Sequence, residues 1–261
     1  MVERIQEILA GQMQDARNKS DIRRAKGLKN LAKGVARADA RGWFSNDAPL
    51  SQLTERERIL AIPDLRERTY ELLSLVREPS KEEREVLEKK MNLVILSLEA
   101  KPLSKVVAAD PNYFWDGELD YVNGKSELRD FTPPALVVAI NPDPKHIALH
   151  DSFIQSRPTQ LVMIEEYSQR VIEKEFPDAK AIMLPATGYA QADWIYNHRP
   201  ETKSKILFRN FYARALDNTS GVYAADVGRY RPDYRLHVRG WNVDDGLGNV
   251  GGVPAVVFLR K

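Results

Sequence analysis

The chain ends in the stretch RGWNVDDGLGNVGGVPAVVFLRK, residues 239–261, and this stretch decides how the fold is interpreted. Its first part is rich in Gly, Asn and Asp around one tryptophan, a composition typical of tight turns. Its last part, VPAVVFL (253–259), is a continuous apolar run that predicts a buried strand. Because terminal residues are usually loose unless a sheet holds them, we expect this strand to anchor the turn-rich segment to the core.

The segment before this tail has both strand and helix patterns. Two runs have the pattern of buried strands, ALVVAI (135–140) and AIML (181–184). Two runs have a helical pattern, QLVMIEEYSQRVIEKEF (160–176), which Pro177 ends, and residues 187–197. Since the strands and helices are segregated along the chain, we expect an α+β domain over residues 131–261.

The first hundred residues have apolar side chains at helical spacing instead. Thr54 with Glu57, and Ser80 with Glu83, have the spacing of capping boxes at helix starts. From Lys81 to about Ala100 the pattern predicts a single helix. We therefore expect an all-α N-terminal domain over 1–105, and a connector over 106–130 that contains Pro and Gly.

The composition is that of a globular protein, and it excludes several kinds of chemistry. The chain has no cysteine, so it has no disulfide, no zinc–thiolate site and no thiol nucleophile. Its net charge of +2 is too small to indicate an acidic partner. The first residues, MVERIQEILAGQMQ, are charged and amphipathic, unlike a signal peptide, and no apolar run has the length of a membrane span. A cytoplasmic location is the default expectation, although nothing in the sequence determines it.

The last sixty residues have an unusual composition. No Lys occurs between Lys205 and Lys261, and no Glu follows Glu201, so the positive charge comes from Arg. Tyr and Trp alternate with Gly, Asp and Asn. Rigid aromatic rings, forked guanidinium groups and adaptable turns are typical of protein recognition surfaces. The same composition is also typical of ordinary Gly-rich β-turns, and both interpretations stay open on composition alone.

Two motifs in this half resemble the C-type lectin-like domain of the formylglycine-generating-enzyme type. KAIMLPATGYAQADWIY (180–196) follows an amphipathic helix and is similar to that family's RLPTEAEWEYA segment. RGWNVDDGLGNVGGVPAVV is similar to its closing region, RGGSW…N…NNxGFRxV. The variable proteins of diversity-generating retroelements use the same fold, with a variable segment at the extreme C-terminus before a fixed final strand. The resemblance covers roughly residues 131–261 and places such a segment at about 223–249.

This resemblance implies a non-enzymatic, ligand-binding display protein whose C-terminal face recognises a ligand, expected to be a protein. It implies no cofactor and no metal, and it leaves self-association through the N-terminal helices open. The expected scaffold consists of Leu184, Trp194, Phe208, Phe211 and the 253–259 strand. Trp241 would belong to the core if it were the fixed aromatic residue of the family. The expected ligand-binding residues are Tyr223, Arg229, Tyr230, Arg231, Asp233, Tyr234, His237, Arg239, Trp241, Asn242, Asp244, Asp245 and Asn249.

An alternative is a nucleic-acid-associated protein. Residues 17–41 are locally basic, and with the Arg/Tyr-rich C-terminal segment they would form a charged stacking surface. A solvated helix face is the more ordinary explanation of such basic residues.

An enzyme has no specific support in the sequence. HIALH (146–150) would place two His on one side of a helix, but it lacks the glutamate of HExxH, so surface or packing histidines are expected. The adjacent Asp244 and Asp245 would generally point apart, which argues against a pair of acid/base carboxylates. A Ca²⁺ ion bound by this Asp/Asn loop is only a slightly better explanation.

Overall fold

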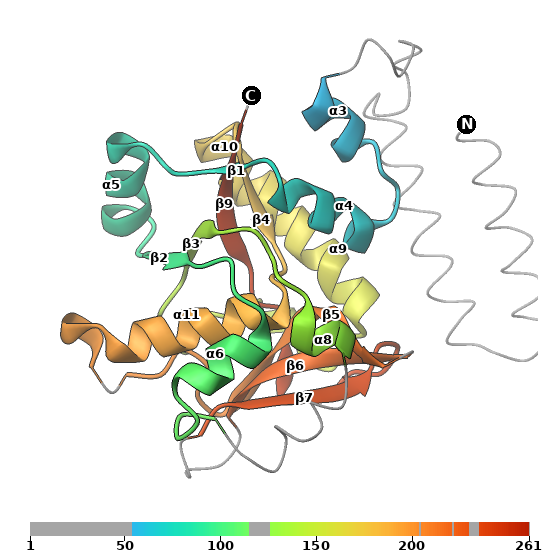
Figure 1. Cartoon of the computed structure of the whole chain (residues 1–261). Coiled ribbons are helices and arrows are strands. Elements are labelled where there is room, and N and C mark those ends of the chain that lie inside the picture. Colours follow the sequence, from blue (N-terminus) through green and yellow to red (C-terminus); the bar gives the residue numbers. More distant parts are fainter. Residues whose placement is uncertain (1–53, 115–125, 204, 221, 230–234, 261) are drawn as a thin grey trace, which may run out of the picture. The chain divides into compact units, whose positions relative to one another are not determined.

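The computed structural model describes residues 54–114, 126–203, 205–220, 222–229 and 235–260 (Figure 1). The chain divides into two compact units, Met1–Thr54 and Glu55–Lys261, and the description below concerns the second. The helices expected before residue 54, including the basic segment 17–41, lie outside the described residues.

The described residues contain both helices and sheets, as an α+β fold requires. The first elements are α3 (Glu55–Leu60), α4 (Leu65–Leu73), β1 (Val76–Arg77), α5 (Lys81–Lys89), β2 (Val94–Leu98), α6 (Leu103–Ala109), α8 (Ser126–Asp130) and β3 (Leu136–Ile140). The middle elements are η2 (His150–Ser152), α9 (Arg157–Tyr167), η3 (Ser168–Ile172), α10 (Glu173–Glu175), β4 (Ala179–Ile182), α11 (Ala186–His198) and η4 (Pro200–Thr202). The last strands are β5 (Phe211–Ser220), β6 (Tyr223–Arg229), β7 (His237–Asn242), β8 (Val250–Gly251) and β9 (Ala255–Leu259).

The C-terminal strand β9 is the centre of a five-stranded sheet. It pairs antiparallel with β4 over Ala179–Ile182, and with β1 and β3. All five of its residues are buried. The expectation that the last strand is anchored in the core is therefore confirmed.

The prediction of a single helix from Lys81 to about Ala100 is wrong for its second half. The capping box at Ser80 forms, and α5 begins after it, but the helix ends at Lys89. Asn92 then has a φ of 54°, a left-handed conformation that does not continue a helix. The following VILSL segment forms β2, which pairs along its whole length with β3.

The all-α description of residues 1–105 is accordingly wrong for the part that the structure describes. Strands β1 and β2 join the same sheet as the C-terminal strand. The domain boundary expected at residue 105 falls inside the unit Glu55–Lys261. The expected connector contains the end of α6 and the whole of α8.

Helix α9 packs on the five-stranded sheet, and α11 packs on this sheet and on a second sheet described below. The expected 160–176 helix is present as α9, the π-helical η3 and α10, which follow one another without a break. It contacts β4, and α9 also contacts α4. The expected 187–197 helix is present as α11, which contacts β2 of the first sheet and β5 and β6 of the second (Figure 1). Helix α11 therefore connects the two sheets through the core.

The second sheet has four strands in the order β7-β6-β5-β8. Strands β5, β6 and β7 are antiparallel neighbours, and the short β8 runs parallel to β5. Strand β5 has register shifts between Arg214 and Ser220, so its regular pairing with β6 covers Phe211 to Arg214. Much of the Arg/Tyr-rich segment of the sequence thus belongs to this sheet.

Candidate recognition face on the second sheet

The second sheet has one apolar face and one polar face. Because side chains alternate along a strand, the register of β5, β6 and β7 decides which of them share a face. The core-facing side carries small apolar residues that are almost completely buried, Ala213, Ala225, Val227 and Val238. The opposite side, called the polar face below, carries Tyr212, Arg214, Asp226, His237, Arg239 and Trp241.

A row of charged residues crosses the polar face. Asp226 on β6 lies opposite Arg214 on β5 and Arg239 on β7. The side chains of Arg214 and Asp226 are completely buried, and Nε of Arg214 lies 3.2 Å from Oδ1 of Asp226. Burial lowers the pKa of Arg214, whereas the neighbouring Asp226 opposes that shift. The row contains two cations and one anion, so it has a net positive charge.

Arg239 has a different environment from Arg214. Its guanidinium carbon lies 3.6 Å from the ring centroid of Tyr212, a cation–π distance. Its Nε and Nη2 atoms are buried and have no hydrogen-bond partner. The His237 ring meets the Tyr212 ring edge-on, with 6.4 Å between centroids. Two residues further along β7, Trp241 has 36% of its surface exposed.

The loop after β7, residues 242–249, is held mainly through its backbone. The buried Arg214 donates to the carbonyl oxygens of Asn242 and Asp245, at 3.2 and 3.0 Å. Main-chain hydrogen bonds join this loop to the segment before α9, to the start of β5 and to the turn before β6. They are Arg157 N to Val243 O, Ile154 N to Leu247 O, Tyr212 N to Asn249 O, and Val243 N to Val222 O. The side chains of Asp244 and Asp245 remain exposed.

The N-terminus of α9 supports the same region. The Arg157 guanidinium donates to the carbonyl oxygens of Leu216 and Asp217 and to Oδ1 of Asn218. Burial lowers the pKa of Arg157 to about 10, so the group stays protonated at neutral pH. Asp217 in turn accepts hydrogen bonds from the Tyr70 hydroxyl and from the Ala186 backbone N–H at the start of α11. Helices α4, α9 and α11 are thereby fixed to strand β5.

The structure brings together only some of the expected binding residues. His237, Arg239 and Trp241 share the polar face, and the loop after β7 carries Asn242, Asp244, Asp245 and Asn249. Tyr223 is 45% exposed at the start of β6, and it alternates away from the polar face. The remaining expected residues between β6 and β7 lie outside the described residues: Tyr230, Arg231, Asp233 and Tyr234.

Arg229 was expected on the recognition surface, and that expectation is wrong. It is 2% exposed and points to the core side of β6, where it forms an ion pair with the fully buried Asp193 of α11. The guanidinium carbon lies 4.7 Å from the Tyr113 ring centroid, and the Tyr113 hydroxyl also donates to Asp193. Burial and Asp193 both raise the pKa of Tyr113. Arg229 therefore stabilises the fold from inside.

Sequence reasoning missed three residues of the polar face, Tyr212, Arg214 and Asp226. A signal exists for the first two, because the run FYARAL (211–216) alternates in the way that a strand with one polar face does. Asp226 has no comparable signal, since its place opposite Arg214 follows from the register alone.

The expected scaffold residues are buried with one exception. Leu184 and Phe208 are fully buried, and Phe211 is 6% exposed. Trp194 is only partly buried: its ring stacks on His198 with 4.5 Å between centroids, and its Nε1 donates to Asp110. Trp241 is also outside the core, so it does not have the buried position expected of the family's fixed aromatic residue.

The HIALH segment is not one helix, because residues 146–149 are irregular and His150 begins the 3-10 helix η2, so His146 and His150 do not share a helix face. His146 instead contacts the nearby Asp143, and His150 lies exposed beside Asp151. Across the part of the chain that the structure describes, no group of three or more His, Cys, Asp or Glu could hold a metal ion. Among the same residues, no helix combines the length and the apolar character needed to cross a bilayer.

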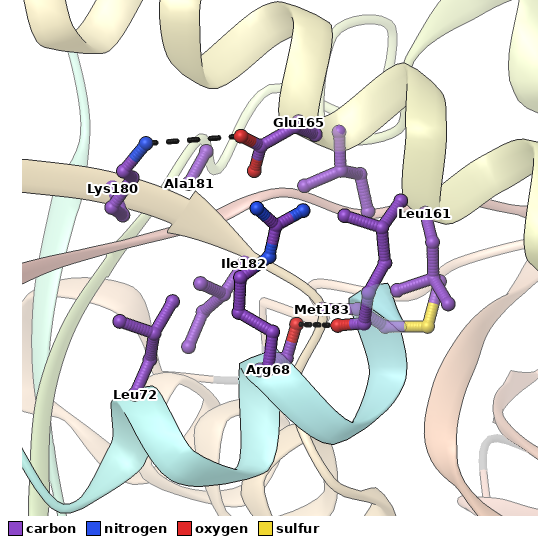
Figure 2. A pocket seen from close by; sticks show the side chains of 11 residues that line it. Arg68, Leu72, Leu161, Glu165, Lys180, Ala181, Ile182 and Met183 are labelled. Carbon is purple, nitrogen blue, oxygen red and sulfur yellow. Dashed lines mark hydrogen bonds and ion pairs between the residues drawn. The ribbon is translucent and has the colours of Figure 1, made fainter. Parts of the chain in front are cut away.

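A small cavity lies between α4, α9 and β4 (Figure 2). Its volume is about 10 Å³, which is at the lower limit for one water molecule. Figure 2 shows Lys180 directed toward Glu165, an ion pair of 3.8 Å, and Arg68 on the facing helix. Lys180 also binds Glu173 at 2.7 Å, so its charge is compensated. This cavity is too small for an organic ligand.

In comparisons with known proteins, no family model, no curated protein and no solved structure matches the chain. The polar face and the loop after β7 are therefore the candidate site on their geometry alone. Aromatic rings, a guanidinium group and exposed carboxylates can recognise a ligand by stacking, charge and hydrogen bonds.

Proposed function

We propose that this chain is a non-enzymatic ligand-binding protein, with the polar face and the loop after β7 as its recognition surface. The diversifiable segment is about residues 223–249, which spans β6, β7 and the loop after β7, and the ligand is a protein. The scaffold is a C-type lectin-like domain of the kind that diversity-generating retroelements use for display.

The observation that carries this proposal is how the loop 242–249 is held. Its anchors to the rest of the fold are backbone atoms and the buried Arg214, and among its own side chains Asn242 accepts a hydrogen bond from the Asp244 backbone N–H at 2.9 Å. Exposed side chains such as Asp244 and Asp245 can therefore change while the loop keeps its course. A display surface needs this separation, because binding positions have to vary on rigid supports.

The arrangement of the chain also favours the C-type lectin-like scaffold. The last strand lies in the middle of one sheet, where it pairs with β1 from near the start of the unit. Two helices, α9 and α11, precede a second sheet built from the C-terminal part of the chain. This order agrees with the two motifs that resemble the family.

The exposed Trp241 and the partly buried Arg239 of the polar face favour protein recognition over catalysis. Trp, Tyr and Arg are the residues that most often dominate the binding energy of protein interfaces. The thiol chemistry of the formylglycine-generating enzymes has no nucleophile here, since the chain contains no cysteine.

The first test is to sequence the 3′ end of the gene, with its flanking DNA, in a natural population. In the variable proteins of diversity-generating retroelements, the variable positions derive from adenine-rich codons. The proposal therefore predicts that codons within residues 223–249 vary at adenine positions, whereas those for residues 253–261 stay constant. It also predicts a near-copy template and a reverse-transcriptase gene nearby. An invariant segment without a template would contradict the display function.

A laboratory library provides an independent test. One library randomises the loop positions Asp244, Asp245 and Asn249 and keeps Asn242, whose side chain accepts from the Asp244 backbone N–H. A matched control library randomises the buried positions Arg214, Asp226 and Arg229. We expect most members of the loop library to stay folded and some to bind individual proteins of a screening panel, whereas few control members fold. Equal loss of folding in the two libraries would show that the loop side chains are structural.

A further inference from the structure

Arg239 stands out on the polar face because no described residue compensates its charge. The described residues contain no carboxylate within ion-pair distance of it, although Asp226 lies directly opposite on β6. Asp226 instead pairs with Arg214. Two donors of Arg239, Nε and Nη2, are buried without a hydrogen-bond partner. Leaving buried charged donors unsatisfied is costly, so such a group is a candidate for completion by a ligand.

The contacts of Arg239 fix its orientation. The guanidinium lies over the Tyr212 ring at 3.6 Å, and the ring is itself buried and in edge-on contact with His237. Such stacking uses the face of the guanidinium and leaves its in-plane N–H groups free to donate. Little side-chain entropy is then lost when a ligand binds, because the arginine is already held.

The two unsatisfied donors are the pair on one edge of the guanidinium. Nε and Nη2 present parallel N–H groups, which match the two oxygen atoms of a carboxylate in a bidentate geometry. A ligand group that reaches these buried atoms is itself removed from water. Only a negatively charged group that satisfies both donors offsets that cost.

We propose that Arg239, stacked on Tyr212, is a subsite that binds a carboxylate side chain of the protein ligand. This inference rests on the proposed binding function and names the chemistry of one contact within it. Arg239, the cation of the Arg214–Asp226–Arg239 row that no described carboxylate pairs with, attracts the carboxylate. The exposed Trp241 on the same face supplies apolar contact area beside it.

The surroundings favour a single carboxylate over the phosphates of a nucleic acid. The loop after β7 places the exposed side chains of Asp244 and Asp245 at the end of this strand. A polynucleotide brings several phosphates, which these carboxylates repel. A protein ligand can place one acidic side chain at Arg239 and neutral groups near the loop.

The test uses the full chain labelled with ¹⁵N-arginine, and it follows the Nε–H signals by NMR. The signal of Arg239 is assigned by its disappearance in Arg239→Lys. The probes are N-acetylglutamate amide, which carries one carboxylate, the neutral N-acetylglutamine amide, and a single-stranded oligothymidylate. A matched control variant is Arg209→Lys, because Arg209 is an exposed arginine that precedes β5.

We expect the glutamate probe to shift the Arg239 signal in a saturable way, and the glutamine probe to leave it unchanged. Arg239→Lys should weaken binding of the glutamate probe by about tenfold or more, since Lys cannot make the bidentate contact. Arg209→Lys should keep the affinity of the unaltered chain.

Three results would overturn the inference: no saturable shift, equal responses to the glutamate and glutamine probes, or tighter Arg239-dependent binding of the oligonucleotide. The first two would mean that water satisfies the arginine, and the third that the site takes phosphate. The NMR test measures binding by this one chain, whereas the population sequencing measures whether codons differ between natural copies of the gene, so failure of this subsite and failure of the display function can be distinguished.

Discussion

Arg229 and Arg239 provide a matched pair that tests the separation of core and face. Both arginines lie in the last strands of the second sheet, but they point to opposite sides of it. We expect Arg229→Met to destabilise the protein strongly and Arg239→Met to destabilise it little. Met retains much of the apolar volume of an arginine, so each substitution mainly removes the guanidinium.

The magnitude for Arg229 follows from the bonds of Asp193. Its carboxylate is completely buried and accepts hydrogen bonds from Leu207 N at 2.9 Å, from Phe208 N at 3.2 Å and from the Tyr113 hydroxyl at 2.7 Å, in addition to the Arg229 contact. Removal of one partner from a buried ion pair costs about 3–5 kcal/mol. Because three donors remain, we expect the lower end of that range, about 3 kcal/mol.

Arg239 forms no ion pair with any residue that the structure describes. Its removal costs the stacking contact with Tyr212, about 1 kcal/mol for a partly buried cation–π pair. At the same time it relieves two unsatisfied donors. The two variants should therefore differ by about 2 kcal/mol or more in the free energy of unfolding.

Urea denaturation at neutral pH measures this difference directly. For a unit of this size, a loss of about 3 kcal/mol lowers Tm by roughly 6–12 °C, so thermal unfolding provides a second readout. In a double-mutant cycle, Asp193→Asn should cost less in the Arg229→Met background than alone, with a coupling of about 0.5–3 kcal/mol. Equal losses for the two arginine variants, or a loss below about 0.5 kcal/mol for Arg229→Met, would refute this reasoning.

Three further predictions concern the scaffold. A hydrogen bond from Arg77, the last residue of β1, lowers the pKa of Glu83. The unaltered chain should therefore be more stable than Glu83→Gln above the carboxyl's ordinary pKa of 4.5, and this difference in stability should disappear as the pH falls below it. Urea titrations across this range measure it, and a constant difference would contradict it. Phe208→Ala should cost about 3–5 kcal/mol because the side chain is fully buried. Trp194→Ala should cost clearly less in the same denaturation assay because Trp194 is only partly buried. Gly228→Ala should cost at least about 1–3 kcal/mol, since its Cβ would lie 2.1 Å from a backbone oxygen of β5. The Cβ of Gly248→Ala would meet nothing within 4 Å, so this control variant should change thermal stability little. Equal losses of stability in Gly228→Ala and Gly248→Ala would mean that the backbone at Gly228 moves without cost.

Local patterns predicted the elements whose signals do not depend on distant pairing. The helix that Pro177 follows and the apolar strand 255–259 were both visible in the sequence, because a proline and a continuous apolar run act locally. The segment 81–98 failed for the opposite reason. Its apolar residues fit a helical repeat across the whole stretch, and only the left-handed Asn92 and the pairing of β2 with β3 divide it into a helix and a strand.

In the candidate site too, local sequence patterns do not show which face of the sheet a residue lies on. Arg229 and Arg239 look alike in the sequence, since both lie among Gly, Asp and aromatic residues. Their faces are set by the register Asp226↔Arg239, which places every second residue of β6 and β7 on the polar side. A shift of one residue would exchange the two faces, and no local pattern fixes that register.

Arg214 helps to explain how the turn-rich tail is ordered mainly through contacts to its backbone. It is fully buried, and its donors reach two backbone carbonyls of the loop after β7, so the loop conformation depends on an arginine of β5. Backbone carbonyls are present whatever residue occupies the position. The Gly, Asn and Asp residues of the loop allow its turns, while β9 holds the end of the chain in the core. The tail can thus combine a fixed path with replaceable side chains, which is the property that a recognition surface on a stable scaffold requires.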